Sequence, residues 1–279
     1  MSVVRVVVLT SLAMIAFASN SILCRLALAH TDIDAASFTT IRLTSGAAAL
    51  WIIVQMRHSR SGSGNWLSAL ALFVYAAAFS FAYSTLTAAT GALLLFGAVQ
   101  ATMIGHGLWA GERLRGPQIL GLILALGGLV GLLLPGLSAP PLIGSVLMLS
   151  AGVAWGVYSV RGKAAGDPTR VTAGNFLRTI PLAIALSLAM LNRTTLDTAG
   201  AWYAFLSGAL TSGIGYAIWY TALPALRATS AATLQLSVPV IAAVGGVVLL
   251  DEPLTARLML TSIAILGGIG LFIQAKQAR

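Results

Sequence analysis

The sequence predicts an all-α membrane protein of ten transmembrane helices, and three observations carry this prediction. Charged residues are 8% of the 279 residues, against roughly 25% in soluble domains. Apolar residues are 58%, and the mean hydropathy is +0.93. Uncharged segments reach 51 residues, far beyond the roughly 20 that cross a bilayer. Because lipid offers the backbone no hydrogen-bond partners, a bundle of membrane-spanning helices satisfies such a chain.

The charged residues delimit the helices in order, because a charge at the centre of a span costs about 2.5 to 3.5 kcal/mol. The first uncharged segment is 6–24, and the next helix contains Arg42. The 51-residue segment 61–111 holds two helices, broken at its Thr- and Ala-rich centre, residues 84–91. This accounts for the first four helices.

Later in the chain, the 45 uncharged residues 116–160 hold two helices. Pro135, Gly136 and the Pro140-Pro141 pair supply the turn between them. A further helix contains Arg178 and is expected to begin near Thr172. The last three spans are 198–226, 228–250 and 258–275.

Basic residues give the orientation. The chain has 16 Lys and Arg against 7 Asp and Glu, scattered singly at the ends of apolar segments, which indicates membrane topology and no nucleic-acid partner. Of the 16, Arg25, Arg42 and Arg178 lie inside helices, and Arg193 and Arg257 lie on one side of the membrane. Eleven lie on the other: Arg5, Arg57, Arg60, Arg113, Arg115, Arg161, Lys163, Arg170, Arg227, Lys276 and Arg279. The positive-inside rule then puts both termini in the cytoplasm, and we expect a multi-pass protein of the bacterial inner membrane.

The chain is expected to be a duplication, residues 1–136 and 137–279. Glu112-Arg113-Leu114 and Gly127-Gly128 recur as Glu252-Pro253-Leu254 and Gly267-Gly268, both at an offset of 140. Arg42 matches Arg178 at an offset of 136. Five helices per half is an odd number, so the second copy is inverted in the membrane, as in many transporters. Arg5 and the segment after it also imitate a cleavable signal peptide, but their internal counterpart favours a retained helix.

Two stretches resemble the drug/metabolite transporter superfamily, in its ten-helix branch of two EamA-type repeats. They run from Phe81-Ala82-Tyr83 to Gly127-Gly128 and from Tyr220-Thr221-Ala222-Leu223 to Gly267-Gly268. The resemblance covers the whole chain and implies an exporter of small metabolites, with a cavity lined by helices one to four of each half and peripheral fifth helices. Within the branch, the chain resembles the YddG-type exporters of aromatic and other neutral amino acids.

Two arginines and several amides are candidates for substrate binding. Arg42 and Arg178 are charges inside spans and could pair with a substrate carboxylate, although Arg178 is shallow enough to snorkel to the interface. An amide can orient a zwitterion or simply join two helices. The amides within spans are Asn20, Gln100, Asn175 and Gln235.

Aromatic residues fall into two groups. Those at span ends are expected to form the interfacial belt: Trp51, Trp66, Trp109, Trp202 and Tyr203. Those within spans recur at helical spacing, either as core packing or as the wall of a cavity for an apolar or aromatic side chain. The cavity candidates are Tyr75, Phe79, Tyr83, Trp155, Tyr158 and Tyr216.

Other residues have competing interpretations. His106 is either a proton carrier or a buried structural imidazole. Glu112 and Glu252 are expected to cap the helices that follow them, with Pro253 at the first helical position. Three residues are hinge candidates: Gly213, Gly215 and Pro239.

These features predict a secondary transporter that exports small neutral or aromatic amino acids by alternating access. The alternative is a transporter whose substrate is a nucleoside, a sugar derivative or an uncharged toxic compound. An intramembrane enzyme is disfavoured, because the spans hold no Asp or Glu and no His-rich metal spacing. We expect no cofactor or metal; the partners are the lipid bilayer and the substrate, and the chain acts as a monomer or homodimer.

Overall fold

The computed structural model describes residues 2–57, 62–111, 113–136, 139–162, 167–226, 231 and 234–277, and these residues form helices without strands. Glu112 and Lys163 lie outside them. The helices of the first half are α1 (Val3–His30), α2 (Ala35–Arg57), α3 (Trp66–Tyr83), α4 (Ala88–Trp109) and α5 (Gly116–Leu133). Those of the second are α6 (Leu142–Arg161), α7 (Pro168–Ala189), α8 (Thr198–Leu206), η3 (Ser207–Ile214), α9 (Gly215–Ala222), α11 (Ser237–Leu250) and α12 (Ala256–Gln277), with short 3₁₀ turns η2 (Leu191–Arg193) and η4 (Leu223–Ala225).

Eight of these helices are long and apolar enough to cross a membrane. The breaks predicted at 84–91 and around Pro135 to Pro141 are confirmed, because α3 ends at Tyr83 and α5 at Leu133. The span predicted at 198–226 runs through α8, a π-helical segment η3 and α9. The prediction that the helix containing Arg178 begins near Thr172 is wrong, because Asp167 caps it from one residue before Pro168.

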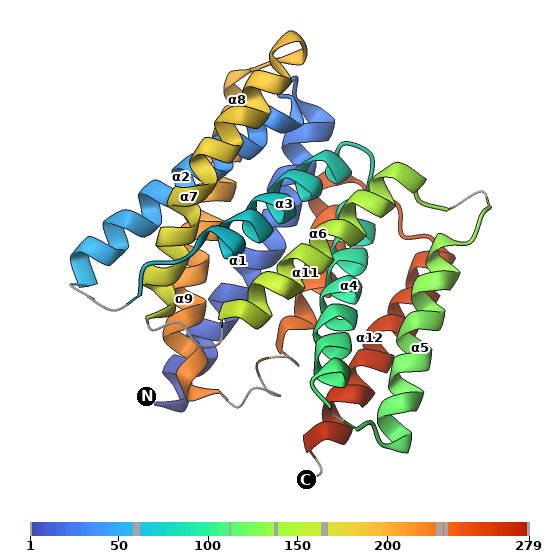
Figure 1. Ribbon diagram of the computed structural model, residues 1–279. Coiled ribbons are helices and arrows are strands. Elements are labelled where there is room, and N and C mark those ends of the chain that lie inside the picture. The colour runs from blue at the N-terminus through green and yellow to red at the C-terminus, as the bar shows by residue number, and fades with distance from the viewer. Residues whose placement is uncertain are drawn as a thin grey trace.

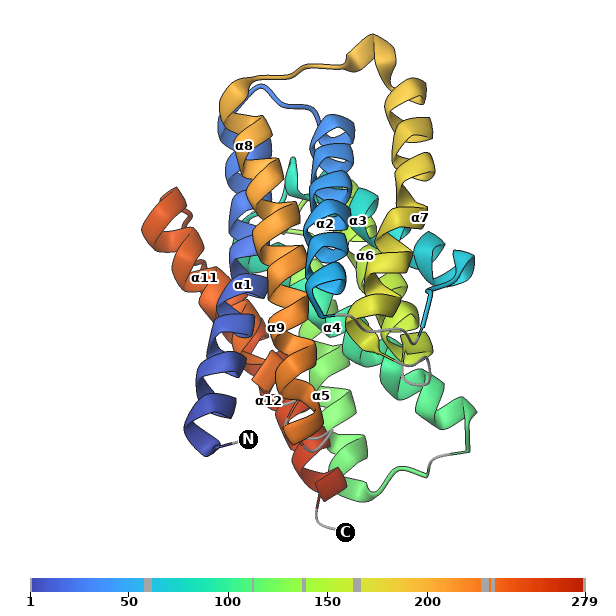
Figure 2. The same ribbon diagram turned by 90° about the vertical axis from the view of Figure 1, so that its left-hand side faces the viewer.

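The helices of the two halves pack reciprocally (Figures 1 and 2). The first helix of one half, α1, contacts α9 and α11 of the other, while α6 contacts α3 and α4. The second helices, α2 and α7, pack against each other, and each also contacts the third helix of the opposite half. The centre of the bundle is therefore an interface between halves.

The fifth helices lie to one side of this bundle. Figure 1 shows α5 and α12 side by side, next to α4. Their approach depends on two glycines: a Cβ on Gly121 would lie 2.5 Å from the carbonyl oxygen of Gly268, and a Cβ on Gly268 would lie 2.5 Å from that of Gly121. The two peripheral helices thus pack backbone to backbone.

The two ends of the bundle differ in their connections. We call the end with both chain termini (Figure 2) the basal end; there Arg57 donates to Thr169 and Thr221. The opposite, apical end holds links 31–34, 84–87, 194–197 and 251–255. Tryptophans predicted for the interfacial belt are exposed at helix ends, Trp109 by 87% and Trp66 and Trp202 by 60% each.

Candidate functional site

Arg42 lies at the centre of the bundle, on α2. Its side chain is 1% exposed, and its Nη2 donates to the hydroxyl of Tyr75 at 3.0 Å. The guanidinium also lies 4.8 Å from the ring centroid of Phe79 and 5.2 Å from that of Tyr75. Its Nε and Nη1 are buried without a hydrogen-bond partner. Arg42 therefore holds two free donors beside aromatic faces.

No carboxylate of the described residues neutralises this charge. Those residues include six acids, all in links outside the helices: Asp32, Asp34, Asp167, Asp197, Asp251 and Glu252. A buried charge without a partner is costly. A guanidinium with N–H groups free on two nitrogens is suited to donate to a carboxylate. The site can therefore bind an anionic group from outside the chain.

Around Arg42, rings from both halves form a continuous aromatic cluster. The ring centroid of Trp155, on α6, lies 4.9 Å from that of Tyr75 and 5.4 Å from that of Tyr216. Trp155 also stacks on Tyr158 at 5.3 Å. The predicted aromatic candidates thus come together, with three further members. The cluster comprises Phe17, Tyr75, Phe79, Tyr83, Trp155, Tyr158, Phe176, Tyr216 and Trp219.

Asn20 joins the cluster to the π-helical segment. Its Nδ2 donates to the Tyr75 hydroxyl at 3.4 Å. Its Oδ1 accepts from the hydroxyls of Ser207 at 2.7 Å and Thr211 at 3.3 Å. Tyr75 therefore accepts from both Arg42 and Asn20, and a hydrogen-bonded chain links η3 of the second half to Arg42 of the first.

The structure separates Arg178 from its sequence equivalent Arg42. Arg178 Nη1 donates to the carbonyl oxygens of Ser63 at 2.6 Å and Gly174 at 2.8 Å. It therefore holds the segment before α3 and does not enter the aromatic cluster. Asn175 lies between these regions: its Nδ2 donates to Tyr158 at 3.3 Å, and its Oδ1 accepts from Asn65 N at 2.9 Å.

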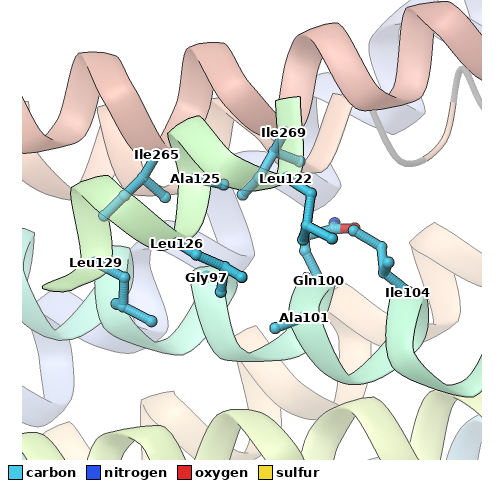
Figure 3. A pocket seen from close by; sticks show the side chains of 10 residues that line it. All are labelled: Gly97, Gln100, Ala101, Ile104, Leu122, Ala125, Leu126, Leu129, Ile265 and Ile269. Atoms are coloured by element: carbon cyan, nitrogen blue, oxygen red, sulfur yellow. The ribbon is translucent and has the colours of Figure 1, made fainter. Parts of the chain in front are cut away.

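Three other candidates lie away from the cluster. Gln100 lines a space of about 10 Å³ between α4, α5 and α12, shown in Figure 3, among leucine and isoleucine side chains. Gln235 is half-buried just before α11. His106 is exposed on the last turn of α4, with its ring centroid 6.3 Å from that of Trp109. The expectation of a buried imidazole is therefore wrong.

The three hinge candidates occupy distinct backbone environments. A Cβ on Gly213 would lie 2.8 Å from that of Ala49, and one on Gly215 would lie 2.9 Å from that of Ala16. Both glycines thus allow close approach to α2 and α1. Pro239 follows a turn at Leu236 that separates helical residues 234–235 from α11. Because proline cannot donate to residue 235, the interruption agrees with the expected break.

Glu252 caps a helix, but a different one from that expected. Its Oε2 accepts from the backbone N–H of Ala88, the first residue of α4, at 2.7 Å. Its Oε1 pairs with Arg25 Nε at 3.0 Å. Helix α12 begins only at Ala256, so Pro253 does not take its first position.

Asp34 connects the halves at the apical end. Its carboxylate accepts from the N–H groups of Ala36 and Ser37 at 2.9 Å and of Thr195 at 3.0 Å. Burial acts to raise its pKa, but hydrogen bonds from Ser37, Thr195 and Ala36 outweigh this and hold the pKa below its usual value.

Several residues of the site were missed from sequence. Phe17 and Phe176 belong to no aromatic run at helical spacing, and Trp219, which shares such spacing with Tyr216, was not among the cavity candidates. Ser207 and Thr211 belong to a polar run inside an apolar span, Ser207-Gly208-Ala209-Leu210-Thr211-Ser212. That run was the available signal for a functional segment, because hydroxyls in a span usually face protein.

Comparison with known proteins gives a family match across the chain. The profile of the EamA-like transporter family matches residues 4–134 and again 142–274. An uncharacterised protein of Pseudomonas aeruginosa is 56% identical over 277 residues, 99% of this chain and 96% of that protein. A probable amino-acid metabolite efflux pump of Escherichia coli is 28% identical, over 57% of this chain and 58% of that protein.

Two further comparisons extend along the chain. An uncharacterised transporter of Archaeoglobus fulgidus is 28% identical over 88% of this chain and 89% of that protein. A solved crystal structure at 19% identity superposes with a TM-score of 0.68 over the full length of both chains. At that identity the likeness extends to the fold alone.

Proposed function

Because this chain belongs to the EamA-like transporter family, we propose that it exports small neutral amino acids, aromatic ones among them, across the bacterial inner membrane. In this proposal the two halves are inverted repeats with cytoplasmic termini. They rock around the aromatic cluster, which opens to each side in turn. The reciprocal packing of α1 and α6 on the opposite halves supports such a pair of near-equivalent arrangements.

The observation that carries the proposal is Arg42. A transporter for a cationic drug would need a buried carboxylate, whereas this cluster holds a buried guanidinium with two nitrogens free of hydrogen bonds. A substrate carboxylate would accept from one of these two nitrogens, and its side chain would lie among Trp155, Tyr158 and Tyr216. The name of the Escherichia coli relative, an amino-acid metabolite efflux pump, points to the same substrate class.

The direct test is uptake of labelled phenylalanine and leucine into proteoliposomes that contain the purified protein. We expect saturable uptake in the wild type and none in Arg42→Gln, which keeps hydrogen-bonding capacity but loses the charge. Uptake of both amino acids unchanged by Arg42→Gln would contradict the role of the guanidinium. Absence of uptake of any amino acid would refute the substrate class.

Energy coupling is tested in the same vesicles. Because His106 is exposed at the basal end of α4 and outside the cluster, we propose that transport follows the substrate's own gradient. An imposed pH gradient should leave uptake unchanged. Accumulation driven by the gradient, and lost in His106→Gln, would instead establish proton exchange through His106.

A further inference from the structure

An ion pair crosses between the halves at the apical end. Arg25, on α1 of the first half, donates from Nε to Oε1 of Glu252 at 3.0 Å. Glu252 lies in the link between α11 and α12 of the second half. The two side chains are only 19% and 9% exposed, so solvent screens this pair less than an ordinary surface pair.

The backbone around Glu252 turns its side chain inward. Asp251 adopts a left-handed conformation with φ of 51°, which reverses the chain after α11. The Glu252 N–H then donates to the Gly246 carbonyl at 3.1 Å. A Cβ on Gly246 would lie 2.7 Å from the Glu252 carboxylate, so the glycine leaves the space that the carboxylate occupies.

Besides α1 and the 251–255 link, the pair contacts a third segment of the apical end, the turn between α3 and α4. Arg25 Nη1 donates to the carbonyl oxygens of Tyr83 at 3.0 Å and Ser84 at 3.5 Å. Glu252 Oε2 accepts from Ala88 N at the positive end of α4. Breaking the pair would therefore release α1, the 84–87 turn and the 251–255 link from one another.

The pair lies at the end of the aromatic row that starts beside Arg42. Tyr75, Phe79 and Tyr83 follow one face of α3, with centroids 5.5 Å and 4.7 Å apart in succession. Tyr75 bonds Arg42, and the Tyr83 carbonyl bonds Arg25. A solute leaving Arg42 along this row would meet the Arg25–Glu252 pair before the apical surface.

We propose that the Arg25–Glu252 ion pair is the apical closure of the transport pathway, formed when that end is shut and broken when it opens. The inference rests on the alternating access proposed above. In the closed structure water reaches little of either charge, so it screens their attraction only weakly. The pair therefore stabilises the shut state. Loss of the pair shifts the population toward the apically open state.

The chain carries its own reporter of this opening. Cys24 is its single cysteine; it precedes Arg25 on α1 and is 0% exposed. The experiment measures the rate at which a membrane-impermeant maleimide alkylates Cys24 when added from the apical or the basal side of sealed vesicles. Cys24→Ala sets the background, and no substrate is needed.

We expect slow alkylation of the wild type and a rise of about tenfold from the apical side in both Glu252→Gln and Arg25→Gln. The two substitutions change the charge near the thiol in opposite directions. A purely electrostatic effect on thiolate reactivity would therefore move the two rates oppositely, whereas opening raises both. The control Asp251→Asn removes the neighbouring exposed carboxylate and should leave the rate at the wild-type value.

Unchanged apical alkylation rates in both variants would overturn the proposal. A rise in Glu252→Gln alone would also overturn it, because the effect would then belong to the cap of α4. An equal rise from both sides of the membrane would indicate general loosening of the protein and would overturn it as well. Failure of amino-acid uptake with a selective apical rise would reject the proposed substrate and keep the closure. Amino-acid uptake without a rise in the apical alkylation rate would keep the proposed substrate and reject the closure.

Discussion

Substitution of the buried Arg42 is expected to affect transport and thermal stability differently. Two nitrogens of Arg42 lack partners, and a buried charge without an opposite charge costs stability, so an apolar side chain of similar length should be tolerated. We therefore expect Arg42→Met to abolish amino-acid uptake while the melting temperature in detergent stays equal or rises.

Arg178→Met is the matched control. Arg178 donates to the carbonyl oxygens of Ser63 and Gly174, and hydrogen bonds from charged donors contribute about 1.5 to 3 kcal/mol each. This variant should melt at a lower temperature. An equal loss of thermal stability in both variants would make Arg42 a structural residue.

The carboxylate of Asp34 gives the apical end a dependence on pH. Because hydrogen bonds lower its pKa in the folded protein, its contribution is present above the unfolded pKa of about 3.9 and is lost as the pH falls below that value. The melting temperature of the wild type should therefore fall more steeply below about pH 4 than that of Asp34→Asn. Parallel curves for the two proteins would show that Asp34 contributes no such stability.

At the scale of elements, local sequence signals located most helix boundaries. The turn chemistry of Pro135 to Pro141 separated α5 from α6, and the weak centre of 61–111 separated α3 from α4. The π-helical register of η3 left no such signal, because its neighbours determine it: Ser207 bonds Asn20 of α1. The target of Glu252 was hidden for the same reason, since Ala88 lies in the other half.

The close packing of the peripheral helices α5 and α12 is expected to depend on Gly121. A Cβ on Gly121 would meet the backbone of α12 at 2.5 Å from Gly268 O and 2.8 Å from Phe272 N, and backbone atoms cannot rotate away. Gly121→Ala should therefore destabilise the protein by about 1 to 3 kcal/mol, measured by thermal unfolding in detergent. Gly127 on the same helix has open space within 4 Å, so Gly127→Ala should be neutral; a similar loss in both would contradict the packing argument.

For the whole molecule, the recurrence of Glu112 to Gly128 at an offset of 140 predicts a duplicated chain, and this stays a prediction. In the structure, helices of residues 1–136 pack against helices of residues 137–279. Depth in the span already separated Arg178 from Arg42, but it did not predict their different contacts. Arg42 packs among rings contributed by both halves, whereas Arg178 bonds a link, and these contacts depend on tertiary neighbours.

The charge distribution over the two ends predicts orientation. Among the described residues, basal helix ends and links carry Arg5, Arg57, Arg113, Arg115, Arg161 and Arg170 with Asp167 as their acid, while the apical end holds Asp32, Asp34, Asp197, Asp251 and Glu252. Because basic flanks are retained in the cytoplasm, we expect both termini there. Alkaline phosphatase fused after Thr194 should be active, and fused after Arg115 inactive, with a fluorescent protein at the C-terminus folding in the cytoplasm. The reverse pattern would invert the molecule and turn the apical closure toward the cytoplasm, where it would govern substrate entry and not release.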